Sequence, residues 1–165
     1  THTSLGPFSE GYAVFGDLGP KVKGKPRELL MGLLNVELKV ALTPAWHVLG
    51  PVSEGLLAGG KRDTDKKLHW QYLRPDGTVA FSLKETDILF AHPFKGGRAR
   101  IQTPDKQGFI DTQGKWVVPL QYKQAGDFQE GVAVVRRSDN KYLFINPDGT
   151  PAFPGTGCAR CVPLR

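Results

Sequence analysis

Short apolar runs closed by polar turns recur along the chain. Residues 72–78, 109–115 and 144–150 share one pattern, in which an aromatic and an apolar residue precede a polar turn that contains glycine. Residues 33–39 form a fourth copy, with Leu38 at the glycine position. Pro and Asp suit the middle of a type I turn, and the glycine after them takes the left-handed conformation that closes the turn. Each copy therefore predicts a hairpin of antiparallel strands, with positive φ at Gly114 and Gly149.

A second sequence element recurs in the same register as the first one. Residues 8–11, 52–55, 94–97 and 128–131 each read as an apolar residue, a polar residue and then Glu-Gly or Gly-Gly. An alternation of small and apolar residues follows in three copies, which predicts that the element begins a strand. We expect the repeated glutamate to tie adjacent units together by hydrogen bonds. Two elements that keep one register over four copies indicate an internal repeat.

This repeat predicts an all-β fold of antiparallel β-meanders. Three to four units of 35–39 residues, each with about three strands, would stack or close into a barrel or propeller-like array. The 20 Gly and 13 Pro argue against long helices, and only residues 27–34 are expected to make a helical turn. The chain begins in the second half of one unit and stops after the first half of another. A closed array would need such ends, and an open stack is the alternative.

We expect one repeat domain over residues 1–165, interrupted by insertions at 15–29 and 59–67 and followed by a tail at 154–165. No apolar run approaches the ~20 residues that cross a bilayer, so no transmembrane segment is expected. The chain begins at Thr1 without an initiator Met. A removed leader and a fragment of a longer protein both remain open.

The repeat resembles that of the WG repeat family, which is bacterial. Its units read roughly as Trp-Gly-aromatic-Ile-Asp, a Gly-Lys turn, a Val-Ile-Pro strand, Tyr-x-x-Ala and Phe-x-Glu-Gly-x-Ala-Val. Residues 106–134 follow this pattern closely. No copy keeps both Trp and Gly, because the pairs at that place are Met31-Gly32, Trp70-Gln71, Gln107-Gly108 and Tyr142-Leu143. The resemblance implies β-rich interaction modules rather than an enzyme, and it brings no catalytic residues.

The residues themselves point away from catalysis and metal binding. The four histidines, His2, His47, His69 and His92, fall at different phases of the repeat, and none has a partner at the spacing of metal ligands. Neither a Gly-x-Ser-x-Gly elbow nor a phosphate-binding Gly-Lys-Thr loop occurs. We therefore expect no catalytic residue, no metal site and no cofactor.

Cys158 and Cys161 are the only cysteines and form a Cys-x-x-Cys pair near the end of the chain. The pair is half of a zinc site without a second half, and its surroundings do not predict a redox centre. We expect a short disulfide, with two plain thiols as the alternative. A disulfide would favour an exported protein, periplasmic or extracellular, over a cytoplasmic one.

The balance of 22 Lys and Arg against 16 Asp and Glu gives a formal charge of +6. The candidate partner-binding residues are Lys21, Lys23, Lys25, Arg27, Lys61, Arg62, Lys66, Lys67, Arg98, Arg100, Arg136 and Arg137. We rank a protein partner first, an anionic polymer or membrane surface second and nucleic acid third, because the aromatic residues fall at core positions rather than on a stacking platform. The predicted function is a non-catalytic interaction module, acting as an adaptor, an inhibitor or an envelope-associated component. An enzyme with an unrecognised site is the least favoured hypothesis.

Overall fold

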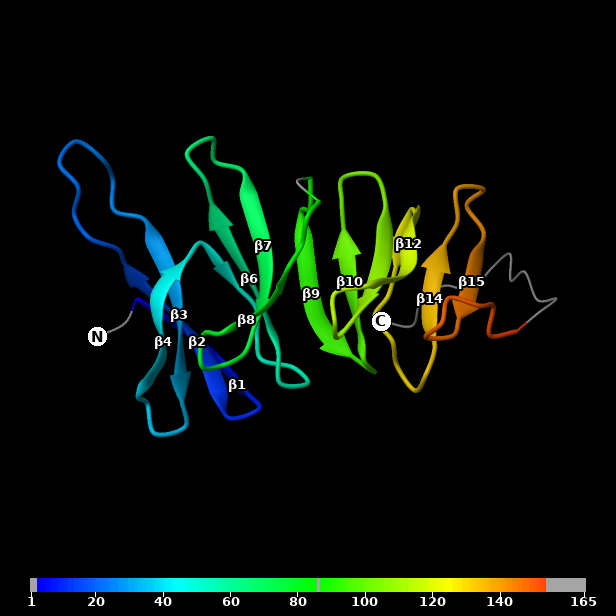
Figure 1. Cartoon of the computed structure of the whole chain (residues 1–165), viewed down its shortest axis with the longest axis horizontal. Coiled ribbons are helices and arrows are strands. Elements are labelled where there is room, and N and C mark those ends of the chain that lie inside the picture. The colour runs from blue at the N-terminus through cyan, green and yellow to red at the C-terminus, as the bar shows by residue number, and fades with distance from the viewer. Residues whose placement is uncertain (1–2, 86, 154–165) are drawn as a thin grey trace. The chain divides into compact units, whose positions relative to one another are not determined.

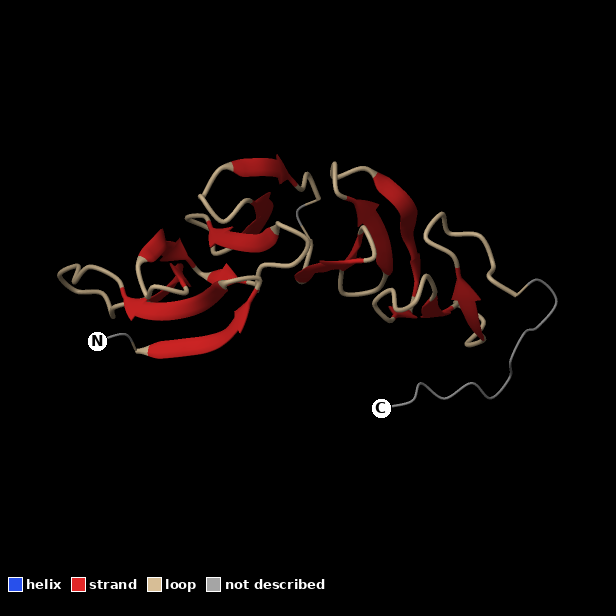
Figure 2. Ribbon diagram, turned by 90° about the horizontal axis from the view of Figure 1, so that it is seen from below, coloured by secondary structure: helices blue, strands red, loops and turns tan. Residues whose placement is uncertain are grey.

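The computed structural model describes residues 3–85 and 87–153, which form antiparallel sheets without any helix (Figure 1, Figure 2). The predicted all-β antiparallel fold is thus confirmed. The first two sheets contain β1 (Ser4–Ser9), β2 (Tyr12–Leu18), β3 (Leu29–Asn35) and β4 (Val40–Trp46), then β5 (Val48–Leu49), β6 (Leu57–Arg62), β7 (Leu68–Leu73) and β8 (Val79–Ser82). The other two contain β9 (Phe90–Lys95), β10 (Arg98–Gln102), β11 (Gln107–Asp111) and β12 (Trp116–Tyr122), then β13 (Gln124–Ala125), β14 (Ala133–Arg136) and β15 (Tyr142–Ile145). No described segment is a helix able to cross a membrane.

Each sheet is a meander, because its strands are hydrogen-bonded in the order of the chain. Three of the sheets have four strands, so the unit is longer by one strand than the sequence predicts. In the last sheet a single bridge between Ile145 and Pro151 stands where a fourth strand would lie. The strand orders are linear, and no sheet of the described residues closes into a barrel. β1 pairs with β2 of its own sheet rather than completing the last unit.

Contacts divide the chain into two compact units, unit 1 (Thr1–Thr86) and unit 2 (Asp87–Arg165), with two sheets each. The division falls between the second and third sheets rather than at either predicted insertion. Strand residues extend into both insertions, so the loops themselves are shorter and cover residues 19–28 and 63–67. The helical turn expected at residues 27–34 is wrong, since β3 pairs along its length with β2. The predicted tail at 154–165, with Cys158 and Cys161, lies outside the described residues.

Each unit buries an apolar cluster drawn from both of its sheets. In unit 1 the cluster consists of Leu33, Trp46, Leu49, Val52, Leu57 and Leu73. In unit 2 it consists of Phe109, Val118, Tyr122, Phe128, Ala133, Val135 and Ile145. Val52 and Phe128 are the apolar residues that begin the Glu-Gly elements, and the rings of Phe109 and Phe128 meet edge to face with centroids 4.9 Å apart. The first residue of this element therefore anchors one sheet on the sheet before it.

The turns between third and fourth strands have the predicted conformation. Gly77, Gly114 and Gly149 have φ of +86°, +79° and +86°. Leu38, in the copy without glycine, has φ of +59°. Side-chain oxygens of the turn Asn and Asp residues accept backbone N–H groups, as Asp111 does from Gln113 and Lys115. The prediction of positive φ at Gly114 and Gly149 is confirmed.

A strand begins directly after the Glu-Gly element, as predicted, since β2 begins at Tyr12. The element is in addition the turn that joins the first two strands of a sheet. Glu10 and Gly11 have φ of +49° and +81°, so both residues are left-handed, as a two-residue type I′ hairpin requires. The Glu10 carboxylate accepts the backbone N–H groups of Glu54 (2.6 Å) and Gly55 (2.9 Å) in the equivalent turn of the next sheet. The predicted glutamate link between adjacent repeats is thus present between the first and second sheets.

The structure also explains why some copies of the repeat have glycine at the second position of the Trp-Gly pair and others do not. A Cβ added to Gly32 would lie 2.6 Å from the Leu42 carbonyl oxygen, and one added to Gly108 would lie 2.6 Å from that of Val118. In both sheets the pairing of third and fourth strands shifts register beside the glycine. In the second sheet Gln71 instead pairs directly with Ser82, so a side chain fits there. Close approach of the bulged fourth strand is therefore what requires glycine.

Candidate functional site

Most of the predicted basic contact residues lie at the connection between the second and third strands of their sheets. The β2–β3 loop carries Lys21, Lys23, Lys25 and Arg27, the β6–β7 hairpin carries Lys61, Arg62, Lys66 and Lys67, and the β14–β15 hairpin carries Arg136 and Arg137. This connection marks the same edge in every sheet. In unit 1 both loops project to one side of their sheets, upward in Figure 1. The structure thus gathers these residues at equivalent edges.

Several of these side chains hold their own loops. Arg27 closes the base of the β2–β3 loop, where it donates to the carbonyl oxygens of Gly19 (2.8 Å) and Leu18 (3.2 Å). The Lys61 ammonium lies over the Trp46 ring, 4.2 Å from its centroid. Lys21, Lys23 and Lys25 of the β2–β3 loop are exposed, and their side chains make no hydrogen bond or ion pair with a described residue.

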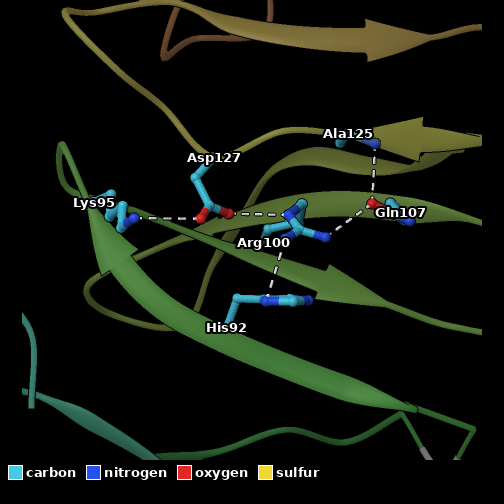
Figure 3. A network of polar contacts seen from close by, with 6 residues as sticks. All are labelled: His92, Lys95, Arg100, Gln107, Ala125 and Asp127. Atoms are coloured by element: carbon cyan, nitrogen blue, oxygen red, sulfur yellow. Dashed lines mark hydrogen bonds and ion pairs between the residues drawn. The ribbon is translucent and has the colours of Figure 1, made fainter. Parts of the chain in front are cut away.

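Arg98 and Arg100 lie on β10 within unit 2, away from these connections. Arg98 donates from Nε to the Pro147 carbonyl oxygen at 2.7 Å, so it joins β10 to the last turn of the neighbouring sheet. Arg100 lies at the centre of a polar network between the two sheets of unit 2 (Figure 3). Both guanidinium groups are engaged in contacts that hold unit 2 together.

In this network Arg100 donates to Asp127 Oδ1 (3.0 Å), Gln107 Oε1 (3.2 Å) and His92 Nδ1 (3.2 Å) (Figure 3). Since a guanidinium can only donate, His92 Nδ1 accepts and the imidazole is neutral. Burial lowers the pKa of His92, and the Arg100 charge lowers it further, against a hydrogen bond with Gln102 and the charge of Asp127 that act upward. The network therefore favours an uncharged histidine.

Gln107 links this network to a cavity of about 300 Å³. Its Oε1 also accepts the Ala125 N–H at 3.0 Å, so the amide bridges β11 and β13. The cavity is lined by Gln107, Gln124, Ala125, Gly126, Val134, Arg136 and Tyr142. Gln107 and Tyr142 both stand where the repeat pattern has Trp. The departures from the pattern thus line the cavity, which we call the Arg136 pocket.

Arg136 is the cation of the Arg136 pocket. It donates to Gln124 Oε1 (3.4 Å) and to Asn140 Oδ1 (3.1 Å), and its guanidinium carbon lies 5.8 Å from the centroid of the Tyr142 ring. Its Nε atom is buried and has no hydrogen-bond partner. Burial of such a donor without a partner costs about 1–3 kcal/mol.

Arg136 is recognisable in the sequence as a basic residue, but the pocket around it is not. The pocket joins residues of β11, β13, β14 and β15 from two sheets, whose facing sides no single segment reveals. The available signal was the replacement of a large Trp by Gln107 in the copy that follows the family pattern best. No group of three or more potential metal ligands occurs among residues 3–85 and 87–153.

Comparison with known proteins agrees with the repeat. The family described as "WG containing repeat" matches residues 108–142, which confirms the resemblance. The crystal structure of HIRA(644-1017) superposes with a TM-score of 0.57 at 15% identity, covering 89% of this chain and 51% of that one. This likeness concerns the fold alone. No curated protein matches the chain.

A second solved structure, the WD40 beta propeller domain of Doa1, gives a TM-score of 0.43 at 10% identity, which is too low to support an argument. It is covered over 52% of its length and 90% of this chain. The chain thus spans about half the length of the solved structures it matches. Residues 108–142 are thus similar to the WG containing repeat, and they lie within an all-β array of four antiparallel sheets formed by the described residues.

Proposed function

We propose that this chain is a non-catalytic interaction module, and that it binds a protein partner by receiving a carboxylate side chain in the Arg136 pocket. The observation that carries this proposal is the buried Nε of Arg136, a charged donor without an acceptor on a side chain that lines a cavity of about 300 Å³. Planar guanidinium groups match carboxylates in geometry and charge. An Asp or Glu side chain of a partner is therefore the complementary ligand.

A second donor supports the same ligand. Gln107 uses its Oε1 as an acceptor for Arg100 and Ala125, and its amide N–H groups have no acceptor among the described residues. Lys123 and Arg137 lie beside the pocket strands. Asp139 forms an ion pair with Arg137 at 3.7 Å and accepts the Lys141 backbone N–H at 3.2 Å. A carboxylate would therefore enter a site of positive potential with donors already in place.

The basic connections between second and third strands would serve the approach of the partner. Exposed lysines contribute mainly to the rate at which an acidic surface is found, rather than to the lifetime of the complex. An adaptor, an inhibitor and an envelope-associated component would all use such an edge, and they differ in the partner rather than in this chemistry.

The alternative function is binding of an anionic polymer or membrane surface. The unpaired Lys21, Lys23 and Lys25 favour it, because exposed loop cations suit closely spaced phosphate or sulfate groups. The two functions differ in salt dependence. Binding through several phosphates weakens steeply with salt, whereas one carboxylate in a pocket gives a shallow slope.

A titration followed by NMR tests the proposed function. A ¹⁵N-labelled chain is mixed with a short capped peptide that contains one Glu, and with the same peptide containing Gln. We expect the Nε–H resonance of Arg136 to shift with the Glu peptide only. The backbone amide resonances of Ala125 and Gly126, which line the pocket, should shift with it, and these shifts should be lost in Arg136→Gln. The matched control is Arg137→Gln, which removes the same charge from the adjacent exposed residue. Equal shifts with both peptides, or equal loss in both variants, would contradict the proposal.

A further inference from the structure

We propose that copies of this chain associate head to tail, with Phe8 and the turn at Glu10 and Gly11 of one copy docked against Phe144 and Glu130 of the next. The proposal is independent of the Arg136 pocket. It rests on a contact between the first two sheets and on the two halves of such a contact that have no partner among the described residues.

The internal contact joins the first two sheets. Ser9 Oγ donates to the Val52 carbonyl oxygen at 2.7 Å, and the Glu10 carboxylate accepts the N–H groups of Glu54 and Gly55. The glutamate of one turn thus closes over the backbone of the next turn. Charged acceptors of this kind make the stronger class of hydrogen bond.

Glu130 is the half of this contact that lacks its partner. It occupies the position of Glu10 in the last sheet and has φ of +49°, the same value as Glu10. Glu10 and Glu54 interact within the chain, whereas the exposed Glu130 side chain has no partner among the described residues. A non-glycine residue pays about 1–2 kcal/mol for this conformation, so the position carries strain without the bond that accompanies it at Glu10.

The turn at Glu10 and Gly11 is the other half. Its two backbone N–H groups have no acceptor among the described residues, although those of Glu54 and Gly55 are held by Glu10. Phe8, which precedes this turn, is 47% exposed, whereas Val52, Phe94 and Phe128 at the same position are 1%, 0% and 4% exposed. Phe8 therefore lacks the cover that Val52 and Phe128 have within their own units.

The apolar surface that fits Phe8 is present in the last sheet. Phe128 is covered by Phe109 of the preceding sheet, ring against ring. Phe144 is the residue of the last sheet equivalent to Phe109, and it is only partly buried, whereas Phe109 is 1% exposed. Phe153 meets the Phe144 ring edge to face at 5.7 Å but is itself exposed. The last sheet thus has both kinds of group on one sheet. Phe144 corresponds to Phe109, which covers Phe128 in unit 2, and Glu130 corresponds to Glu10, which accepts the turn N–H groups in unit 1.

A second copy is the occupant that supplies both complementary groups at once. Because the two surfaces differ, each copy uses one surface on each side, and the association is heterologous. It buries an exposed aromatic ring and gives a carboxylate two backbone donors, the combination already used inside unit 1 and unit 2.

Sedimentation equilibrium over a wide range of concentration tests the proposal. The mean mass of the unmodified chain should rise with concentration. Phe8→Ser and Glu130→Ala should each weaken association by about tenfold or more, as expected for loss of a buried ring or of hydrogen bonds to a charged group. Val22→Ser and Asp105→Ala are the matched controls, because both residues are exposed and lie at the opposite edge of their sheets.

Mixing the two variants distinguishes head-to-tail association from other modes. Phe8→Ser chains keep an intact Glu130 surface, and Glu130→Ala chains keep an intact Phe8 surface. An equimolar mixture should therefore form dimers through the one intact pair and nothing larger. A chain that stays monomeric at every concentration would overturn the proposal. So would association that the two variants leave unchanged, or a mixture that fails to dimerise although the unmodified chain associates.

Discussion

Leu38 stands in the same left-handed turn position as Gly77, with φ of +59° against +86°. The same hydrogen bond closes both turns. The Leu38 N–H donates to the Asn35 carbonyl oxygen, and the Gly77 N–H donates to the Arg74 carbonyl oxygen, each at 2.9 Å. The backbone conformation of this turn is therefore set by the repeat even where the sequence has lost its glycine.

Replacing Leu38 by glycine should stabilise the protein. The change removes left-handed strain of about 1–2 kcal/mol, and the greater freedom of glycine in the unfolded chain offsets about 0.4–1 kcal/mol of it. Leu38 is 63% exposed, so little apolar burial is lost. We expect a net gain of about 0.5–1 kcal/mol in the free energy of unfolding, measured by urea denaturation. A loss of stability would show that the Leu38 side chain contributes packing.

Alanine at glycine positions should cost stability in an order set by space. Gly108→Ala places a Cβ 2.6 Å from the Val118 carbonyl oxygen, and Gly149→Ala combines φ of +86° with a Cβ 3.0 Å from Val118 Cγ2. We expect losses of about 2–3 kcal/mol and about 1–2 kcal/mol. Gly24→Ala, at φ of +80° with no atom within 4 Å, is the control and should cost the least. Equal losses in all three variants would contradict this account.

The contribution of the Glu10 hydrogen bonds to the free energy of unfolding can be measured by comparison with Glu130, which makes no such bonds with described residues. Glu10→Ala removes both hydrogen bonds to the turn at Glu54 and Gly55 while leaving a non-glycine residue at the same φ. We expect it to lower the free energy of unfolding by about 1 kcal/mol. Glu130→Ala, at a concentration where the chain is monomeric, should change it by less than half as much. Chemical denaturation of both variants makes the comparison.

Stability should fall as the pH drops below the ordinary histidine pKa of 6.5, in part because of His92. Burial and Arg100 lower the pKa of His92 in the folded state, so the unfolded state binds the proton more readily. The stabilisation is therefore present above that value and is lost as the pH falls toward the lowered pKa. Melting temperatures between about pH 7.5 and about pH 5.5 cover this range and stay above the titration of most carboxyl groups.

The contribution of His92 is isolated by His92→Gln, which keeps a hydrogen-bonding side chain but does not titrate. We expect the melting temperature of this variant to depend less on pH in that window than that of the unmodified chain. The other histidines titrate in both proteins and cancel in the comparison. An unchanged or steeper dependence would show that His92 is not held neutral by Arg100.

The sequence predicted the all-β repeat because its turns are local chemistry. Glycine, Asn and Asp close a turn through contacts within five residues, as in the positive φ of Gly114 and Gly149 and the carboxylate of Asp111. The number of strands was less accessible, because the Glu-Gly element signals a bend without showing which strands it joins. Its type I′ geometry depends on the pairing of the strands on either side of it, such as the pairing of Phe8 with Ala13.

The candidate sites divide in the same way. The sequence by itself identified the basic residues and the glutamate that links two sheets, because composition and repetition are visible in one dimension. Tertiary structure alone decided that Arg100 is enclosed in a network with Asp127, that Arg136 faces a cavity, and that Phe8 is exposed where its counterparts are buried. The physical reason is that burial depends on the neighbouring sheet, and residues at identical repeat positions differ in whether that neighbour is present.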